Sequence, residues 1–428
     1  MNPQSPLRRF SRTLFVMLSQ LVGLAASLPA HAADSSEPFE LKASLKYANA
    51  SDQYLMVYSS NEATSGPNIY SRALKSDGTP LGTDVRLSSQ TGKMTKPVLA
   101  YGAKSERFLV VWGRKLADES RAEIVGMSLG LSGGVVHEEF RISVSDLYDQ
   151  RPSIAYCPGR DRFLVTWSRG AQYDYENGDS DVYGQFIAGD GSLMQGGNFL
   201  IATGAKNQFK QDVDCDELND RFLVVWEDQR QEASKDDIYG QLLSSDGTLL
   251  GNNFLIASTP DTERRPVVAA SAKTGTYLVV WEVEMADASV RMFSQTIDPN
   301  GNVLGTPTLI GSNLGGDRNR AAVAYLKQQD MFLVAFDNSA FGDYSDGIYG
   351  QFVASNGKLR QYAFPLTIAQ KGQYRPDVAA ARNTFLAVWT DYRTTVNKDS
   401  THNVYEYFGR VIGNDMALSS RWKNPESK

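Results

Sequence analysis

Basic residues recur along the chain at a regular interval, and their side chains have the chemistry to bind an anion. Six positions share this spacing, namely Lys42, Lys96, Arg151, Arg265, Arg320 and Arg375, and Gln211 stands in the seventh. In five of the seven cases the next Tyr or Phe of an apolar run follows after 12 residues. Lysine and arginine hold carboxylate, sulfate or phosphate groups through charge-assisted hydrogen bonds. This basic series therefore predicts a ring of ligand-binding cations.

A structural role for the basic series is the alternative. An acid often follows the aromatic residue that ends the next apolar run, as at Asp228, Glu282, Asp337 and Asp391. Each cation can pair with such an acid and tie two loops together. The regular repetition of the pattern favours ion pairs, because a ligand site has no need to recur in every repeat.

Acidic residues also gather in one short segment, at Asp174, Asp179 and Asp181. Clustered oxygen atoms can bind calcium, but the spacing of these acids does not match an EF-hand loop. A solvated loop is therefore the simpler interpretation. Calcium is the one metal that the sequence suggests, and we expect no cofactor.

Aromatic residues accompany the same segments, at Tyr148, Tyr173, Phe209, Tyr344, Tyr374 and Tyr392. Exposed rings are common where proteins contact carbohydrates or other proteins, because a rigid amphipathic side chain loses little entropy on binding. We expect some of these rings to contact a ligand and others to pack within their loops.

The elements that hold these residues repeat along the chain. One apolar run recurs at 54–58, 108–112, 163–167, 222–226, 277–281, 332–336 and 385–389, and five of the six tryptophans end such a run. Each run is rich in Val and aromatic residues and apolar on both alternating faces, which is typical of a strand covered on both sides. Self-similarity at a period of about 55 residues indicates a repeat fold.

Each repeat contains four predicted strands. A short strand with alanines precedes the apolar run, as at 97–101 and 152–156, and a third follows it, as at 237–241. Asp-Gly or Asn-Gly pairs, which accept a type I′ hairpin turn, then lead to the fourth. Seven repeats of four antiparallel strands predict an all-β fold, a seven-bladed β-propeller. Loops between strands and between blades would then form one rim of the central channel, a natural binding face.

The pattern Phe-Leu-Val-Val-Trp at 222–226 with Asp-Ile-Tyr-Gly-Gln at 237–241 resembles the repeats of exported bacterial β-propeller proteins. The resemblance covers nearly all of the chain after the leader. It implies a propeller that serves as a binding or scaffold module and, less often, as an enzyme.

The first residues read as an export signal. Arg8, Arg9 and Arg12 precede an apolar run, and Ala30-His31-Ala32 supplies a cleavage site. The run is too short for a membrane span, which needs about 20 apolar residues. We therefore predict a Sec-type signal peptide at 1–32, a propeller at 33–422 and a tail at 423–428. The mature protein would be periplasmic or secreted, where Cys157 and Cys215 could form a disulfide between neighbouring blades or remain thiols.

The composition narrows the partners. The chain has 428 residues and a formal net charge of −6, and residues 1–32 carry three arginines and no acid, so the rest has a charge of −9. That balance excludes a generic nucleic-acid binder. Three histidines, His31, His137 and His402, leave little room for multi-histidine metal sites or His-based triads. Nothing in the sequence sets an oligomeric state.

These features favour a non-enzymatic binding or scaffold module, whose partner is a glycan or an envelope or extracellular protein. The alternative is a glycan hydrolase with its active site in the channel. One version is sialidase-like, with Arg265, Arg320, Arg375, Tyr374 and Glu263 in the catalytic roles. The other is a glycosidase with two carboxylates about 5–9 Å apart. A unique pair of carboxylates close together in the channel would favour the hydrolase.

Overall fold

The computed structural model describes residues 42–62, 66–88, 93–116, 120–172, 179–194, 196–231, 235–339, 347–369, 372–391 and 406–413. These ranges contain β-strands joined by turns and loops, and no helix. They belong to one compact unit, Phe39–Lys428. The predicted signal peptide (1–32) and tail (423–428) lie outside the described residues.

The strands form antiparallel sheets, mostly of four strands that are consecutive in sequence. The first sheet contains β1 (Ala43–Ala48), β2 (Gln53–Glu62), β3 (Gly66–Lys75) and β4 (Pro80–Arg86). Two further groups of four share one parallel bridge, between Ala122 and Tyr148. Their strands are β5 (Lys93–Gly102), β6 (Arg107–Lys115), β7 (Ala122–Leu129), β8 (Val135–Arg141), β9 (Tyr148–Cys157), β10 (Arg162–Gly170), β11 (Asp181–Ala188) and β12 (Phe199–Ala202).

The remaining sheets follow the same plan. They contain β13 (Gln208–Asp216), β14 (Arg221–Asp228), β15 (Asp237–Ser244) and β16 (Leu249–Ala257), then β17 (Thr262–Ala270), β18 (Tyr277–Glu284), β19 (Val290–Ile297) and β20 (Val303–Ile310), then β21 (Asp317–Leu326), β22 (Met331–Ser339), β23 (Gly347–Ala354) and β24 (Phe364–Thr367). The last has three described strands, β25 (Gln373–Ala380), β26 (Phe385–Asp391) and β27 (Glu406–Ile412).

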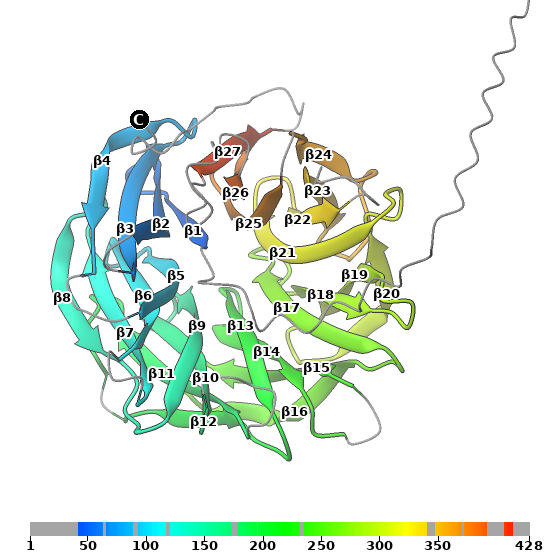
Figure 1. Ribbon diagram of the computed structural model, residues 1–428, viewed down its shortest axis with the longest axis horizontal. Coiled ribbons are helices and arrows are strands. Elements are labelled where there is room, and N and C mark those ends of the chain that lie inside the picture. The colour runs from blue at the N-terminus through cyan, green and yellow to red at the C-terminus, as the bar shows by residue number, and fades with distance from the viewer. Residues whose placement is uncertain are drawn as a thin grey trace, which may run out of the picture. The chain divides into compact units, whose positions relative to one another are not determined.

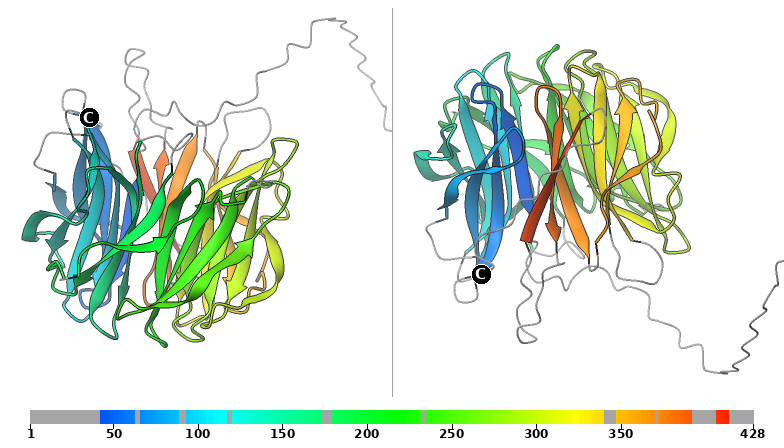
Figure 2. Two further views of the ribbon diagram at one scale, coloured as in Figure 1. Left: turned by 90° about the horizontal axis from the view of Figure 1, so that it is seen from below. Right: turned by 90° about the horizontal axis from the view of Figure 1, so that it is seen from above.

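The first strand of each group lies nearest the central axis (Figure 1). These inner strands are β1, β5, β9, β13, β17, β21 and β25. Each contacts the next in order, and β25 contacts β1, so that they close a ring. Figure 2 shows the sheets standing side by side around the axis. The all-β prediction, the four-stranded antiparallel sheets and the β-propeller are therefore confirmed.

The core lies between neighbouring sheets, and the recurrent apolar runs form it. Trp112, Trp167 and Trp226 are fully buried in the second strands of their groups. Tyr54 and Met56 of the first sheet share one cluster with Leu386 and Val388 of the last sheet. Burying a large apolar side chain contributes about 1.5–3 kcal/mol. Because the second strand is covered on both faces, its apolar residues do not alternate with polar ones.

A disulfide joins Cys157 of β9 to Cys215 of β13. Their Cα atoms are 5.5 Å apart and 58 residues separate them in sequence. Both side chains are buried. The disulfide links two inner strands of the ring, because β9 and β13 belong to neighbouring groups of four strands.

Replacing both cysteines with Ser is expected to lower the free energy of unfolding by about 3 kcal/mol, because the covalent link restricts the unfolded chain. Urea unfolding of the double variant and of the oxidised and reduced wild type measures the effect. Equal midpoints for all three proteins would contradict a stabilising disulfide.

Candidate active site at the central axis

The basic series lies on the inner strands, where each strand has a β-bulge. The residue in the bulge has a positive φ of 50–57° at Lys96, Arg151, Lys210, Arg265, Arg320 and Arg375. The strand pairing shifts at this point, for example between Arg264 and Val267. Left-handed backbone is unfavourable for any residue with a Cβ. The same strained conformation therefore recurs around the axis with a cation in each case.

The seventh position holds Lys210, and the prediction that Gln211 occupies it is wrong. Lys210 has the bulge conformation, and Phe222 follows it after 12 residues, as in the other repeats. Gln211 is the next residue and is buried; its Oε1 accepts a hydrogen bond from Ser168 Oγ at 2.7 Å. We call the corrected set the basic ring: Lys42, Lys96, Arg151, Lys210, Arg265, Arg320 and Arg375.

Three members of the basic ring form ion pairs with buried acids. The acid stands directly after the closing aromatic residue of the same group. The pairs are Lys210 Nζ with Glu227 Oε2 at 3.0 Å, Arg265 Nη1 with Glu282 Oε2 at 3.1 Å, and Arg320 Nη1 with Asp337 Oδ2 at 3.5 Å. Sequence reasoning placed the first acid one residue too late, because Asp228 instead accepts a hydrogen bond from Trp226 Nε1 at 2.7 Å.

The same acids bind the next group of strands. Glu227 accepts a hydrogen bond from the backbone N–H of Arg265, and Glu282 accepts one from that of Arg320 at 2.6 Å. Burial raises the pKa of Glu282, but Arg265 and Arg264 outweigh burial, so the pKa lies below its ordinary value. Buried and fully engaged, these acids hold neighbouring sheets together and cannot contact a substrate.

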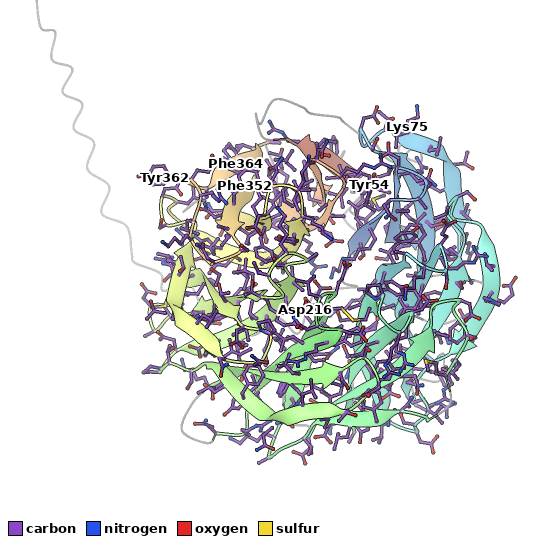
Figure 3. The ribbon with its side chains drawn as sticks, turned by 180° about the vertical axis from the view of Figure 1, so that it is seen from behind. Tyr54, Lys75, Asp216, Phe352, Tyr362 and Phe364 are labelled. Atoms are coloured by element: carbon purple, nitrogen blue, oxygen red, sulfur yellow. A yellow bond between two sulfur atoms is a disulfide. The ribbon has the colours of Figure 1, made fainter. Side chains whose placement is uncertain are left out.

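A second set of inner-strand positions, four residues after each member of the basic ring, breaks the repeat. Alanine occupies five of them, namely Ala100, Ala155, Ala269, Ala324 and Ala379. Lys46 of β1 and Asp214 of β13 occupy the other two, and both are partly exposed. Figure 3 labels Asp216, two residues further along β13, beside the central axis.

Asp214 has an altered acidity. Its Oδ2 accepts a hydrogen bond from the backbone N–H of Ala270 at 2.8 Å. Burial raises the pKa of Asp214 to about 6, and the positive charge of Lys46 opposes that shift. The electrostatic effect of Lys46 on Asp214 joins strands of opposite sides of the ring. A carboxyl group of this kind exchanges protons close to neutral pH.

Asp212 lies two residues before Asp214 on the same side of β13. Its Oδ1 accepts a hydrogen bond from Ser153 Oγ at 2.6 Å, and its Oδ2 accepts one from the backbone N–H of Val268 at 2.9 Å. Asp377 of β25 is its counterpart and accepts a hydrogen bond from the backbone N–H of Leu45 at 2.7 Å. Of the inner strands, β13 alone carries acids at both positions.

Sequence reasoning missed Asp212 and Asp214. A signal was present, because the alanines of the inner strands were recognised as a crowded column near the axis. Asp214 and Lys46 are the two exceptions in that column. Finding them required the register of the inner strands, which the bulge shifts by one residue in β13.

The predicted aromatic ligand residues have different outcomes. Tyr148 begins β9 and Tyr374 lies in β25, both half-buried. Phe209 is buried in β13, with Lys210 Nζ 4.7 Å from the centre of its ring, so the prediction of an exposed loop ring is wrong there. Tyr173, Tyr344 and Tyr392 lie outside the described residues.

The proposed calcium ligands do not meet in the described structure. Asp179 is exposed and Asp181 lies half-buried in β11, while Asp174 is outside the described ranges. Burial and the charge of Asp179 raise the pKa of Asp181. Among the residues that the structure describes, no group of three His, Cys, Asp or Glu side chains is placed to hold a metal ion.

The sialidase-like arrangement is not formed. Arg265 and Arg320 are engaged by Glu282 and Asp337. Glu263 is fully buried, and Thr259 Oγ1 donates a hydrogen bond to it at 2.5 Å. Burial raises the pKa of Glu263 to about 7. A buried carboxyl group cannot transfer a proton to a substrate, so Glu263 does not have the role that the sequence suggested.

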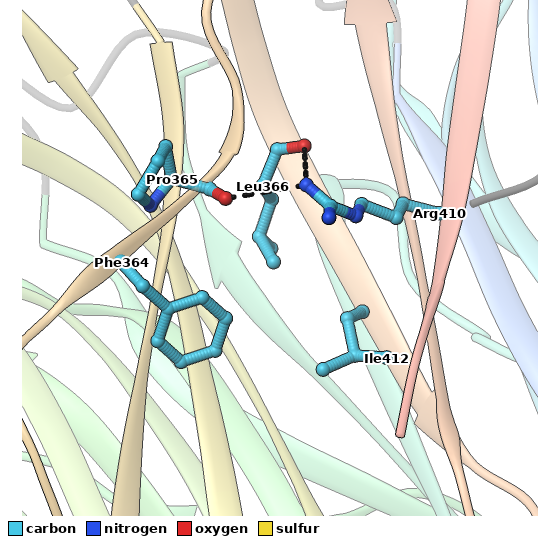
Figure 4. A pocket seen from close by; sticks show the side chains of 5 residues that line it. All are labelled: Phe364, Pro365, Leu366, Arg410 and Ile412. Carbon is cyan, nitrogen blue, oxygen red and sulfur yellow. Dashed lines mark hydrogen bonds between the residues drawn. The ribbon is translucent and has the colours of Figure 1, made fainter. Parts of the chain in front are cut away.

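An apolar pocket lies away from the axis, between β24 and β27 (Figure 4). Phe364, Pro365, Leu366, Arg410 and Ile412 line it. Arg410 Nη1 donates hydrogen bonds to the carbonyl oxygens of Pro365 and Leu366, at 3.3 and 3.0 Å. The described part of the chain contains no helix that is long and apolar enough to cross a membrane.

Comparison with known proteins gives structural neighbours alone. No family model and no curated protein matches the sequence. A protein of unknown function from Dyadobacter fermentans has a TM-score of 0.50 at 11% identity, covering 69% of this chain and 89% of that chain. The Hadza microbial sialidase Hz136 has a TM-score of 0.49 at 9% identity, with coverages of 77% and 72%. The α-L-arabinofuranosidase of Fusarium graminearum has a TM-score of 0.49 at 12% identity, with coverages of 72% and 89%.

These neighbours contradict the expectation of a non-enzymatic binding or scaffold module. The activities named among them are those of glycoside hydrolases, including arabinofuranosidase, arabinanase and sialidase. At such low identity the similarity concerns the fold, so the activity of this chain has to be argued from its own residues.

Proposed function

We propose that this chain is an exported, seven-bladed β-propeller that hydrolyses a glycan in its central channel. The observation that carries the proposal is the pair Asp212 and Asp214 on the axis side of β13. Both are partly exposed, and no other inner strand has two acids at these positions. A catalytic centre is unique, whereas the supporting features of a repeat fold recur. The pair stands where the repeat is broken.

Two further features support the rest of the proposal. The closed ring of inner strands from β1 to β25 supports seven blades. The basic leader, the apolar run and the site after Ala32 support Sec-type export to the periplasm or the medium, as does the resemblance to exported bacterial propeller repeats.

Asp214 is assigned the role of general acid. With a pKa of about 6, it holds a proton in mildly acidic solution and can pass it to the oxygen of the glycosidic bond as that bond breaks. Asp212 is assigned the role of general base, which takes a proton from the attacking water. Its two hydrogen bonds, from Ser153 and Val268, fix the orientation of the carboxylate.

The spacing of the two acids favours inversion at the anomeric carbon. Residues two apart on one side of a strand have Cα atoms about 6.6 Å apart. Inverting glycosidases hold their carboxyl groups about 6.5–9.5 Å apart, which leaves room for the water, whereas retaining enzymes hold them about 5–5.5 Å apart. The released sugar is therefore expected to have the opposite anomeric configuration.

The test is release of reducing ends from a panel of neutral and acidic polysaccharides by the mature protein. Asp212→Asn should reduce the rate at least 100-fold, because it removes the base. Asp377→Asn is the matched control: it alters the equivalent hydrogen bond to the next inner strand, yet should retain activity. No release from any polysaccharide, or equal losses in both variants, would contradict the proposal.

A further inference from the structure

The basic ring is divided into two arcs by the acids beside it. In the groups of β13, β17 and β21 the residue after the closing aromatic is Glu227, Glu282 or Asp337, and each of these pairs with its ring cation. In the other four groups that position holds Ser59, Gly113, Ser168 or Thr390. The four groups are contiguous around the ring, since β25, β1, β5 and β9 contact one another in that order.

The four cations of these contiguous groups therefore form one positive arc: Arg375, Lys42, Lys96 and Arg151. All four side chains are partly exposed. None has an acid at the position that neutralises the cations on the other side of the ring. The positive arc is an excess of charge on one side of an otherwise acidic protein.

The backbone adds an independent observation. Lys96, Arg151 and Arg375 have φ of 50–57°, a region where Gly, Asn and Asp are the favoured residues. A residue with a long side chain costs about 1 kcal/mol or more in this region. On the acidic side the cations are retained by ion pairs with buried acids. In the positive arc, the retention of Lys and Arg indicates a use for the charge itself.

The arc also lies close to the two acids of β13. Arg151 belongs to β9, whose Ser153 donates its hydroxyl hydrogen bond to Asp212. The charge of Arg151 reaches β13 as well: burial lowers the pKa of Lys210, and Arg265 and Arg151 lower it further. A ligand held by the arc would therefore lie beside Asp212 and Asp214.

We propose that the positive arc binds the anionic group of an acidic saccharide and presents its glycosidic bond to Asp212 and Asp214. The carboxylate of a uronic acid and the sulfate of a sulfated sugar share this chemistry, and both accept hydrogen bonds from Lys and Arg. The inference rests on the proposed function for the chemistry that follows binding, but binding itself can be measured separately.

The experiment uses the mature protein with Asp214→Asn, so that bound saccharide is not cleaved. Calorimetry measures its affinity for oligogalacturonate, a sulfated oligosaccharide and a neutral arabino-oligosaccharide. Tighter binding of either anionic probe is expected, and binding should weaken as salt is raised from 50 to 500 mM. Lys96→Gln and Arg151→Gln should each weaken anion binding about tenfold, because hydrogen bonds to charged groups contribute on that scale.

The matched control is the double variant Lys210→Gln, Glu227→Gln, which removes a ring cation together with its acid and leaves the net charge unchanged. It should retain anion affinity. Full affinity after Lys96→Gln and Arg151→Gln, or equal binding of neutral and anionic probes, would overturn the inference. The two proposals fail separately. Cleavage of a neutral glycan that the arc variants leave unchanged refutes the arc alone. Arc-dependent binding without cleavage by wild type refutes the hydrolase alone.

Discussion

Replacing Asp214 with Asn is expected to lower kcat by about 10²–10⁴-fold, because an amide cannot donate the proton that the leaving group requires. The fold should survive, since Asn keeps an oxygen that accepts the hydrogen bond from the backbone N–H of Ala270. The measurement is the initial rate of reducing-end release on the best substrate of the panel. A variant that unfolds at the same urea concentration as wild type and retains full activity would refute the assignment.

The pH dependence tests the same assignment in wild type. Asp214 acts in its protonated form, so the rate should fall as pH rises above its pKa of about 6. Lys46→Met gives the sign check. The positive charge of Lys46 lowers the pKa of Asp214, so its removal should move the alkaline limb of the profile to higher pH. A limb that stays in place would mean that another group supplies the proton.

The fold could be predicted because each repeat buries the same strand on both faces. That requirement leaves a continuous apolar run with a closing Trp, which is visible in the sequence without any spatial information. The bulge on the inner strand is less visible. It shifts side chains by one residue at a place with no distinctive residue type, which is why Gln211 was taken for the ring position of Lys210.

The candidate site was harder to predict for the same reason. Asp214 and Lys46 are far apart in sequence, and their relation appears when β1 and β13 are placed on opposite sides of one axis. Their exceptional character is defined by the five alanines at equivalent positions. The ion pairs were partly predictable: Arg265 with Glu282 and Arg320 with Asp337 follow from repeat spacing. Phe209, by contrast, is packed inside a strand that the sequence suggested was a loop.

Replacing Glu282 with Gln is expected to lower the free energy of unfolding by about 3 kcal/mol. The change leaves the side chains of Arg264 and Arg265 beside a neutral group in a buried place, and removing one partner of a buried ion pair costs about 3–5 kcal/mol. It also weakens the hydrogen bond from the backbone N–H of Arg320, which links neighbouring inner strands. Urea unfolding followed by tryptophan fluorescence measures the loss.

Glu284→Gln is the matched control. Glu284 lies on the same strand, two residues further along, and it pairs with the same Arg264, but its side chain is 40% exposed. Exposed ion pairs contribute about 0–1 kcal/mol, so this variant should unfold close to wild type. Similar small losses in both variants would show that the ion pair of Glu282 does not hold the sheets together.

The loss from Glu282→Gln should depend on pH. Because the folded-state pKa of Glu282 lies below its ordinary value of 4.5, the stability that this carboxylate contributes is present above about pH 4.5 and is lost as pH falls through the lower, folded-state pKa. The difference in unfolding free energy between wild type and Glu282→Gln should therefore be largest near neutral pH and should narrow in acid. A difference that stays constant from pH 7 to pH 3 would mean that the charge of Glu282 is not what stabilises the ring.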